Sequence, residues 1–221
     1  MRIHLVIAAI ALCVVLSGCE NPADDKAGAI TGNANKEKVD VRSAGTGYVF
    51  SGADSSLEFV GSKVTGKEPG SFEKFKGKID LVDDRVERSQ VSFEIDMSSV
   101  KTDSKGLAEH LMTADFFNVE RFPSASFVST RVEQLPGNGG DSYQVTGVLD
   151  FHGVKKSISF PATIKINKDD IRAKGDFFIN RRDFDVNYAG RANDLIRDEV
   201  VIILDIRARP TGMVRSALNE S

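Results

Sequence analysis

Apolar and polar residues alternate with a period of two along most of the chain. The alternation is clearest in four stretches, at residues 57–59, 75–81, 91–97 and 145–151. This is the period of a β-strand with one buried and one hydrated face. Further strands are predicted over 125–135, 155–166, 171–180 and 199–209, with a short strand near Tyr48. The chain is therefore predicted to be all-β, with eight or nine antiparallel strands.

One stretch has helical rather than strand spacing. Apolar residues in 107–117 recur at intervals typical of a helix face, and Asp103 or Ser104 can cap its start. A single short helix among so many strands predicts a β-sandwich or a closed β-barrel. A closed barrel removes the exposed strand edges that an open sheet would leave.

Glycines replace large side chains on the apolar phase of four predicted strands. They are Gly61, Gly77, Gly147 and Gly175. Each would omit inward volume, and an eight-stranded barrel is just wide enough to fill itself with side chains or to hold one small ligand. The glycines favour a hollow barrel. The alternative is that they only allow strong coiling or mark bulges.

Composition adds an apolar interior and removes some classes of partner. The chain has a formal net charge of −3, which does not indicate the basic surface patch that nucleic-acid-binding proteins use. It has 14 Phe against 3 Tyr and no Trp. Most of the aromatic side chains therefore carry no polar group, which favours an apolar interior.

The first residues predict export and lipidation. Arg2 precedes an apolar run over 5–16, which is too short to span a bilayer as a mature helix and is typical of a signal peptide. Residues 16–19, Leu-Ser-Gly-Cys, resemble the bacterial lipoprotein signal. That resemblance implies removal of residues 1–18, a lipid anchor on Cys19 and acyl chains such as palmitate. The alternative is an uncleaved N-terminal anchor helix.

The chain has two cysteines. Cleavage would remove Cys13 and lipidation would occupy Cys19, so no cysteine would remain for a disulfide, a zinc site or a thiol nucleophile. Residues 19–46 show no periodicity and predict a flexible tether with a span of about 30 Å. Residues 47–209 are the expected barrel, and 210–221 a polar tail. The expected location is the cell envelope with the domain in the periplasm, and Glu20 after the cysteine favours the outer over the inner membrane.

A family resemblance covers about three quarters of the chain. The segments that carry it are residues 56–61, 70–77, 96–102, 110–118, 121–127, 147–156 and 180–184. In order and spacing they resemble the YceI-like family of bacterial envelope proteins. The chain departs from the family pattern at Asp185, where glycine is more frequent, and at Asp54-Ser55-Ser56, which lacks a histidine. The resemblance implies an antiparallel, eight-stranded lipocalin-like β-barrel that binds a polyisoprenoid.

The expected function is non-covalent binding of a polyisoprenoid or similar long-chain lipid, such as a quinone, for storage, transport or exchange. No metal or other cofactor is expected, and a homodimer is left open. Arg181 and Arg182 are candidate headgroup contacts, because an arginine fork suits quinone or phosphate oxygens. The predicted ligand-binding residues are Phe59, Phe72, Phe75, Phe93, Ile95, Met97, Leu111, Phe116, Phe127, Gly147, Leu149, Gly175, Phe177, Arg181 and Arg182.

Two rival functions remain at this point. A non-catalytic stress or interaction protein of the envelope would have a barrel filled by its own phenylalanines. An enzyme is disfavoured, because the sequence lacks the usual nucleophile, zinc and phosphate-loop motifs. His152 is expected in a hairpin turn and His110 on the helix, so both are interpreted as structural or solvated side chains.

Overall fold

The computed structural model describes residues 20–34, 45–137 and 140–211. The predicted signal peptide, Cys19 and residues 212–221 of the predicted tail lie outside the described residues. Most of the described chain is in β-strands, with one α-helix, α1 (Lys105–Met112). The helix begins at Ser104, whose Oγ accepts a hydrogen bond from the backbone N–H of Leu107. This confirms the predicted cap, and the helix ends earlier than the pattern indicated.

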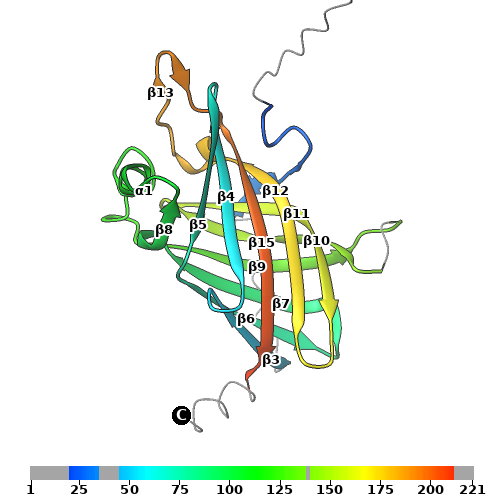
Figure 1. Ribbon diagram of the computed structural model, residues 1–221. Coiled ribbons are helices and arrows are strands. Elements are labelled where there is room, and N and C mark those ends of the chain that lie inside the picture. Colours follow the sequence, from blue (N-terminus) through cyan, green and yellow to red (C-terminus); the bar gives the residue numbers. More distant parts are fainter. Residues whose placement is uncertain (1–19, 35–44, 138–139, 212–221) are drawn as a thin grey trace, which may run out of the picture.

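Eight antiparallel strands close into a barrel (Figure 1). Each strand pairs with the next around the ring, and β15 pairs with both β12 and β3 to close it. The ring consists, in spatial order, of β3 (Thr46–Ser51), β6 (Phe75–Val82), β7 (Arg85–Asp96), β9 (Ser124–Gln134), β10 (Ser142–Phe151), β11 (Val154–Ile166), β12 (Ile171–Asn180) and β15 (Glu199–Pro210). The predicted barrel is confirmed, and each strand of the ring overlaps a predicted strand.

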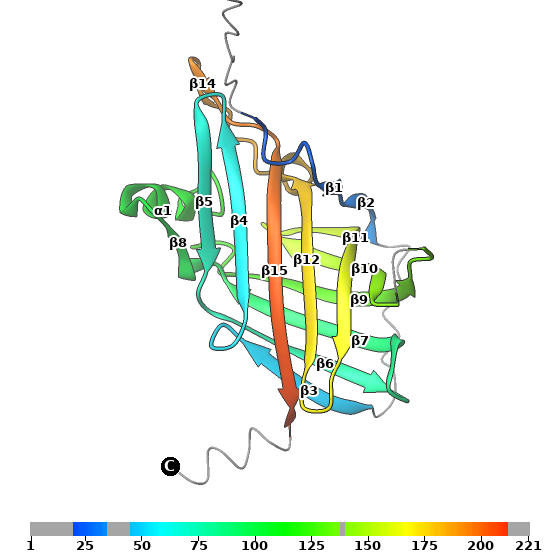
Figure 2. The ribbon, with the colours of Figure 1, turned by 45° about the vertical axis from the view of Figure 1, so that its right-hand side comes forward.

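A second group of strands branches from β15. Only the end of β15, Arg209 and Pro210, pairs with β3, and its earlier residues pair with β4 (Ser56–Lys63) on the same edge. From β4 the sheet continues through β5 (Gly66–Phe72) to the short β8 (Val100–Thr102), which follows the 3-10 turn η2 (Met97–Ser99). The β4–β5 hairpin therefore rises above the ring on one side (Figure 2).

The turn between β10 and β11 confirms the expectation for His152. His152 and Gly153 have φ values of 53° and 77°, in the left-handed region. Two such residues between paired Phe151 and Val154 form the tight two-residue hairpin that suits the twist of antiparallel strands. His152 is held there by its Nδ1, which lies 3.0 Å from the carbonyl oxygen of Phe184.

The N-terminal segment differs from the expected tether in its described part, residues 20–34. Strands β11 and β12 pair only near their connecting turn, where residues 162–166 lie opposite residues 171–175. Farther from the turn they do not pair with each other. Into this gap fit β1 (Ala27–Gly28), parallel to β12, and β2 (Ile30–Asn33), antiparallel to β11. Backbone groups make this pairing, so it needs no side-chain periodicity and left no signal in the sequence. Residues 35–44 of the predicted tether lie outside the described residues.

Candidate functional site

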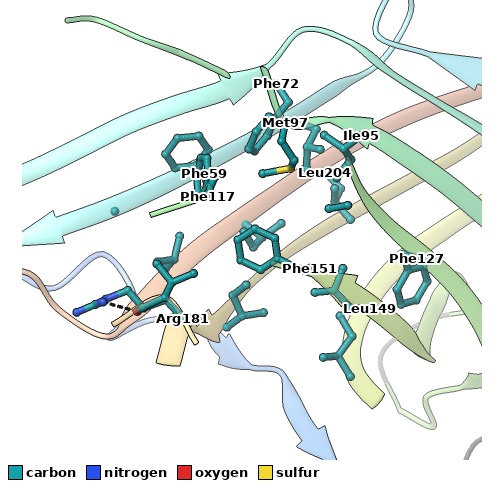
Figure 3. A pocket seen from close by; sticks show the side chains of 18 of the residues that line it. Phe59, Phe72, Ile95, Met97, Phe117, Phe127, Leu149, Phe151, Arg181 and Leu204 are labelled. Atoms are coloured by element: carbon teal, nitrogen blue, oxygen red, sulfur yellow. Dashed lines mark hydrogen bonds between the residues drawn. The ribbon is translucent and has the colours of Figure 1, made fainter. Parts of the chain in front are cut away.

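The barrel encloses an apolar cavity of about 180 Å³ (Figure 3). Residues from β4, β5, β7, β9, β10, β11, β12 and β15 form its wall, and α1 with the residues that follow it covers one side. The lining residues are Leu57, Phe59, Gly61, Phe72, Phe93, Ile95, Met97, Leu111, Phe116, Phe117, Ala125, Phe127, Leu149, Phe151, Ile158, Phe160, Phe177, Ile179, Arg181, Val186, Ile196, Val200, Ile202 and Leu204. Arg181 is the one charged residue among them.

Most of the predicted ligand-binding residues meet around this cavity. Those in its wall are Phe59, Phe72, Phe93, Ile95, Met97, Leu111, Phe116, Phe127, Leu149, Phe177 and Arg181. Phe75, Gly147, Gly175 and Arg182 are outside the wall. Phe75 is buried in the neighbouring core cluster with Phe50 and Ile79. That any of these residues contacts a ligand stays a prediction.

Two of the four glycines do not leave the empty space that the sequence suggested. A Cβ atom on Gly147 would lie 2.4 Å from Cζ of Phe127, and one on Gly77 would overlap the ring of Phe50. Aromatic rings from neighbouring strands therefore fill both positions, and the inward-void interpretation is wrong there. At Gly175 the nearest atom would be 3.5 Å away, an ordinary contact.

Gly61 is the glycine that borders the cavity. It lies on β4 in phase with Leu57 and Phe59, which also line the wall. A Cβ atom there would have a single neighbour within 4 Å, the carbonyl oxygen of Glu68 at 3.9 Å. Volume is therefore missing from the wall at Gly61, as the sequence predicted for all four positions.

Arg181 borders the cavity, but it donates its hydrogen bonds to other groups of the protein. It begins the 3-10 turn η3 (Arg181–Phe184), and its Nη1 donates to the carbonyl of Val186 at 2.5 Å. Nε donates to the carbonyl of Arg197 at 3.0 Å, and Nη2 to that of Ile196 at 3.4 Å. Nη2 also pairs with Asp198 at 3.1 Å. Arg181 therefore ties the segment before β15 to η3, which leaves little capacity for a headgroup.

The pKa of Arg181 reflects its burial beside Asp198. Burial lowers the pKa of the Arg181 guanidinium, and the charge of Asp198 opposes that shift. Arginine nevertheless remains protonated in proteins. Arg182, the other predicted headgroup contact, is about half exposed and pairs with Asp198 at 2.6 Å. Its side chain is outside the cavity wall.

Asp185 adopts a backbone conformation that favours glycine. Its φ of 58° and ψ of 22° lie in the left-handed region, which glycine adopts without steric cost. Aspartate is one of the residues that tolerates this conformation. The departure therefore leaves the local backbone path intact, and Phe184 and Val186 on either side remain buried.

Several wall residues escaped the sequence analysis. Alternation assigned no phase to β15, because residues 200–204 form an unbroken apolar run. The structure shows that Val200, Ile202 and Leu204 line the cavity. Phe117 and Phe151, whose rings lie 5.8 Å apart, complete the wall near the end of α1 and the end of β10. Two adjacent phenylalanines after a helix do not reveal in the sequence that both line the cavity.

The described residues show few features of a catalytic centre. Among them, no three His, Cys, Asp or Glu side chains gather in a way that could hold a metal ion. Nε2 of His110 lies 2.8 Å from a carboxylate oxygen of Asp115 on the surface, and its ring packs edge-on against Phe116 and Tyr188. In the same part of the chain, no helix has both the length and the apolarity to cross a membrane.

The apolar wall determines what the cavity can hold. Apolar groups can enter without leaving buried polar atoms unpaired. A dry cavity of about 150 Å³ binds a molecule the size of benzene, so this one accepts a somewhat larger apolar group as it stands. A longer chain requires wall side chains to move. Met97 and the phenylalanine rings can change rotamer more easily than the strands can shift.

Comparison with known proteins points to one family. Residues 48–208 match the profile of the YceI-like domain. The UPF0312 protein of Pseudomonas putida is 34% identical over 94 residues, which are 42% of this chain and 47% of that protein. Protein YceI of Salmonella arizonae is 33% identical over 101 residues, 46% of this chain and 51% of that one. These alignments span about half the length of the curated relatives.

Solved structures show the same fold. BcnA of Burkholderia cenocepacia aligns with a TM-score of 0.64 and 24% identity over 71% of this chain and 97% of its own. A domain from Saccharophagus degradans, described as polyisoprenoid binding, aligns with a TM-score of 0.61 and 18% identity over 75% and 98%. At this level of identity the likeness extends to the fold alone, and it agrees with the predicted lipocalin-like barrel.

Proposed function

This chain belongs to the YceI-like family, and on that premise we propose that it binds a polyisoprenoid or similar long-chain lipid inside its barrel. The observation that carries the proposal is the cavity of about 180 Å³, whose wall is apolar except for Arg181. The name of the domain from Saccharophagus degradans supports the choice of lipid. Arg181 donates its hydrogen bonds to protein groups and Arg182 lies outside the cavity wall, so recognition would rest on the tail.

Binding of this kind suits exchange with a membrane. Each carbon group removed from water contributes about 0.8 kcal/mol, but a tail in a bilayer has already left water. The cavity therefore needs only to match the bilayer. A domain with such a cavity can take up a lipid and release it without covalent chemistry, so we propose storage, transport or exchange and no enzymatic activity.

The membrane attachment is part of the proposal. We propose that Cys19 carries the lipid anchor and that the domain lies in the periplasm, held at the outer membrane rather than the inner. The resemblance of residues 16–19 to a lipoprotein signal supports this. No polybasic segment would be needed, because several acyl chains together give stable anchoring. A homodimer remains open.

Replacement of Cys19 by serine is expected to abolish acylation and leave the barrel folded. The thiol is the group that would carry the diacylglycerol, and the residue precedes the described fold. Labelling of growing cells with radioactive palmitate tests this. The wild-type protein should carry the label and Cys19→Ser should carry none, with the same thermal midpoint. Equal labelling of the two proteins would show that the lipoprotein assignment is wrong.

Gly61→Leu is expected to remove most bound lipid while the barrel stays folded. The new side chain points into missing wall volume, so it should compete with the tail rather than strain the core. The measurement is bound lipid per protein by extraction and mass spectrometry, together with the thermal midpoint.

Gly140→Leu is the matched control for Gly61→Leu. A Cβ atom on Gly140, in the β9–β10 connection, would have no neighbour within 4 Å, and the residue lies outside the cavity wall. This variant should keep its lipid. If Gly61→Leu retains lipid as well as Gly140→Leu does, the tail does not occupy this cavity.

A second candidate is an interaction protein of the envelope with a filled barrel. It is favoured by the rings of Phe50 and Phe127, which occupy space over Gly77 and Gly147. The cavity is also smaller than the range of about 300–1,000 Å³ that is usual for ligand pockets. Protein without bound lipid in both the wild type and Gly61→Leu would favour this candidate.

A further inference from the structure

Two hairpins form a joint tip at one end of the barrel. The turn between β4 and β5 carries Val64, and the small hairpin of β13 (Gly190–Arg191) and β14 (Asp194–Leu195) carries Leu195. The backbone N–H of Val64 donates to the carbonyl of Leu195 at 3.1 Å, and Lys63 forms a bridge with Ile196. These contacts hold the two hairpins together. We call residues 63–68 and 190–196 the hairpin tip.

The hairpin tip exposes aliphatic side chains. Val64 is 56% exposed and Leu195 51%, whereas large apolar residues of this protein are mostly buried. The backbone hydrogen bond between Val64 and Leu195 holds both residues at the tip. Exposed aliphatic residues side by side on a rigid projection mark a contact surface when other features support one.

The charges of the hairpin tip favour an anionic partner. Its two acids are already paired, because Nζ of Lys63 lies 2.7 Å from Glu68 and 3.5 Å from Asp194. Asp194 also accepts a hydrogen bond of 2.8 Å from the Thr65 hydroxyl. Among the described residues, no ion pair involves the exposed Lys67 or Arg191, which flank the aliphatic pair. The tip is thus net positive on a chain whose formal charge is −3.

The hairpin tip adjoins the cavity and shares an end of the barrel with the described start of the chain. Gly61, two residues before Lys63, and Ile196, within the tip, line the cavity. Figures 1 and 2 both place the β4–β5 turn, the β13–β14 hairpin and the first described residues at one end, with the end of β15 at the other. A surface that touches the tip therefore lies near Gly61 and Ile196 of the cavity wall.

We propose that the hairpin tip docks on an anionic lipid bilayer, with Val64 and Leu195 in the boundary between headgroups and acyl chains and Lys67 and Arg191 on the lipid phosphates. Aliphatic side chains with flanking cations are the combination that binds such a surface. The proposal deepens the proposed function, on which it rests, because it brings the Gly61 side of the cavity to the membrane that supplies the lipid.

The test exploits the absence of tryptophan from the chain. Leu195→Trp introduces one fluorophore at the tip, and Ile166→Trp introduces one at an exposed aliphatic site at the end of β11, on the opposite end of the barrel. Both full-length proteins are mixed with vesicles of phosphatidylglycerol and phosphatidylethanolamine. Leu195→Trp should shift its emission to shorter wavelength and be quenched by brominated acyl chains, and Ile166→Trp should do neither.

Charge variants separate the bilayer from other partners. In the Leu195→Trp background, Lys67→Glu with Arg191→Glu should abolish the shift, as should vesicles of phosphatidylcholine alone. Lys165→Glu with Lys168→Glu, the same charge change near the control site, should leave it intact. The proposal is overturned if Leu195→Trp shows no shift, if Ile166→Trp shifts equally, or if the charge variants at the tip shift as before.

Failure of this proposal is distinguishable from failure of the proposed function. A protein that carries co-purified lipid but shows no emission shift at Leu195→Trp has a lipid cavity and no docking tip. A protein that shifts but carries no lipid docks on the bilayer for another purpose, which supports the tip and counts against the cavity function.

Discussion

Arg181→Ala is expected to lower the free energy of unfolding by about 2–4 kcal/mol, because a buried carbonyl left without its donor costs about 1–3 kcal/mol. The guanidinium is 5% exposed and donates to the carbonyls of Val186, Ile196 and Arg197. Alanine leaves these carbonyls without their donor and Asp198 without its buried partner. Urea unfolding measured by circular dichroism gives the difference.

Arg182→Ala is the matched control for Arg181→Ala. Arg182 pairs with the same Asp198 oxygen, but its side chain is 49% exposed, and exposed ion pairs contribute at most about 1 kcal/mol. Its loss should be small. Similar losses from the two substitutions would contradict the assignment of Arg181 as the tie between η3 and the start of β15. A selective loss of lipid in a fully stable Arg181→Ala would instead restore the headgroup role.

Gly147→Ala is expected to cost about 1–3 kcal/mol, the range for an overpacked core. The added Cβ would lie 2.4 Å from Cζ of Phe127 and 2.5 Å from the backbone oxygen of Val128. The ring can rotate away, but the oxygen belongs to β9, which pairs with β10 beside this glycine. The strand itself must shift. The measurement is again urea unfolding.

Gly175→Ala provides the comparison for Gly147→Ala. Its Cβ would meet Leu204 and Phe177 at 3.5 Å, an ordinary van der Waals distance. This substitution should therefore change stability by less than about 1 kcal/mol, because the backbone needs no positive φ there. Equal costs at the two glycines would mean that their role is backbone coiling rather than close approach of a side chain.

The sequence predicted the ring of strands well because their period reflects a physical constraint. A strand with one face on an apolar interior tends to alternate, and residues 75–81, 91–97 and 145–151 do so in sequence. The same alternation selected Phe59, Phe93 and Phe127 as inward-facing residues, and all three line the cavity. Side chains that follow a strict period can be assigned to a face without a structure.

Other elements left no periodic signal. Strand β5 contains Pro69 and Gly70, which break the pattern of a strand, yet it pairs with β4 over its length. The N-terminal strands pair through their backbone alone. In β15, an unbroken apolar run concealed which residues face inward.

The glycines show where inference from sequence reached its limit. A glycine in the apolar phase removes its own side chain, but the sequence does not reveal whether a ring from a neighbouring strand moves into the vacancy. Phe127 occupies it at Gly147 and Phe50 at Gly77, whereas no ring does so at Gly61. The structural role of Arg181 was also not predictable from the sequence. Carbonyls that it binds come from the segment before β15, and the Asn-Arg-Arg-Asp motif gives no sign of them.

The most direct test of the proposed function is a native mass measurement on the wild-type domain, purified without added lipid or long-chain detergent. We expect a species heavier than the polypeptide by several hundred daltons, which collapses to the polypeptide mass under stronger activation and yields an isoprenoid or other long-chain lipid on extraction. A single species at the polypeptide mass, with nothing extractable, would contradict lipid binding in the barrel.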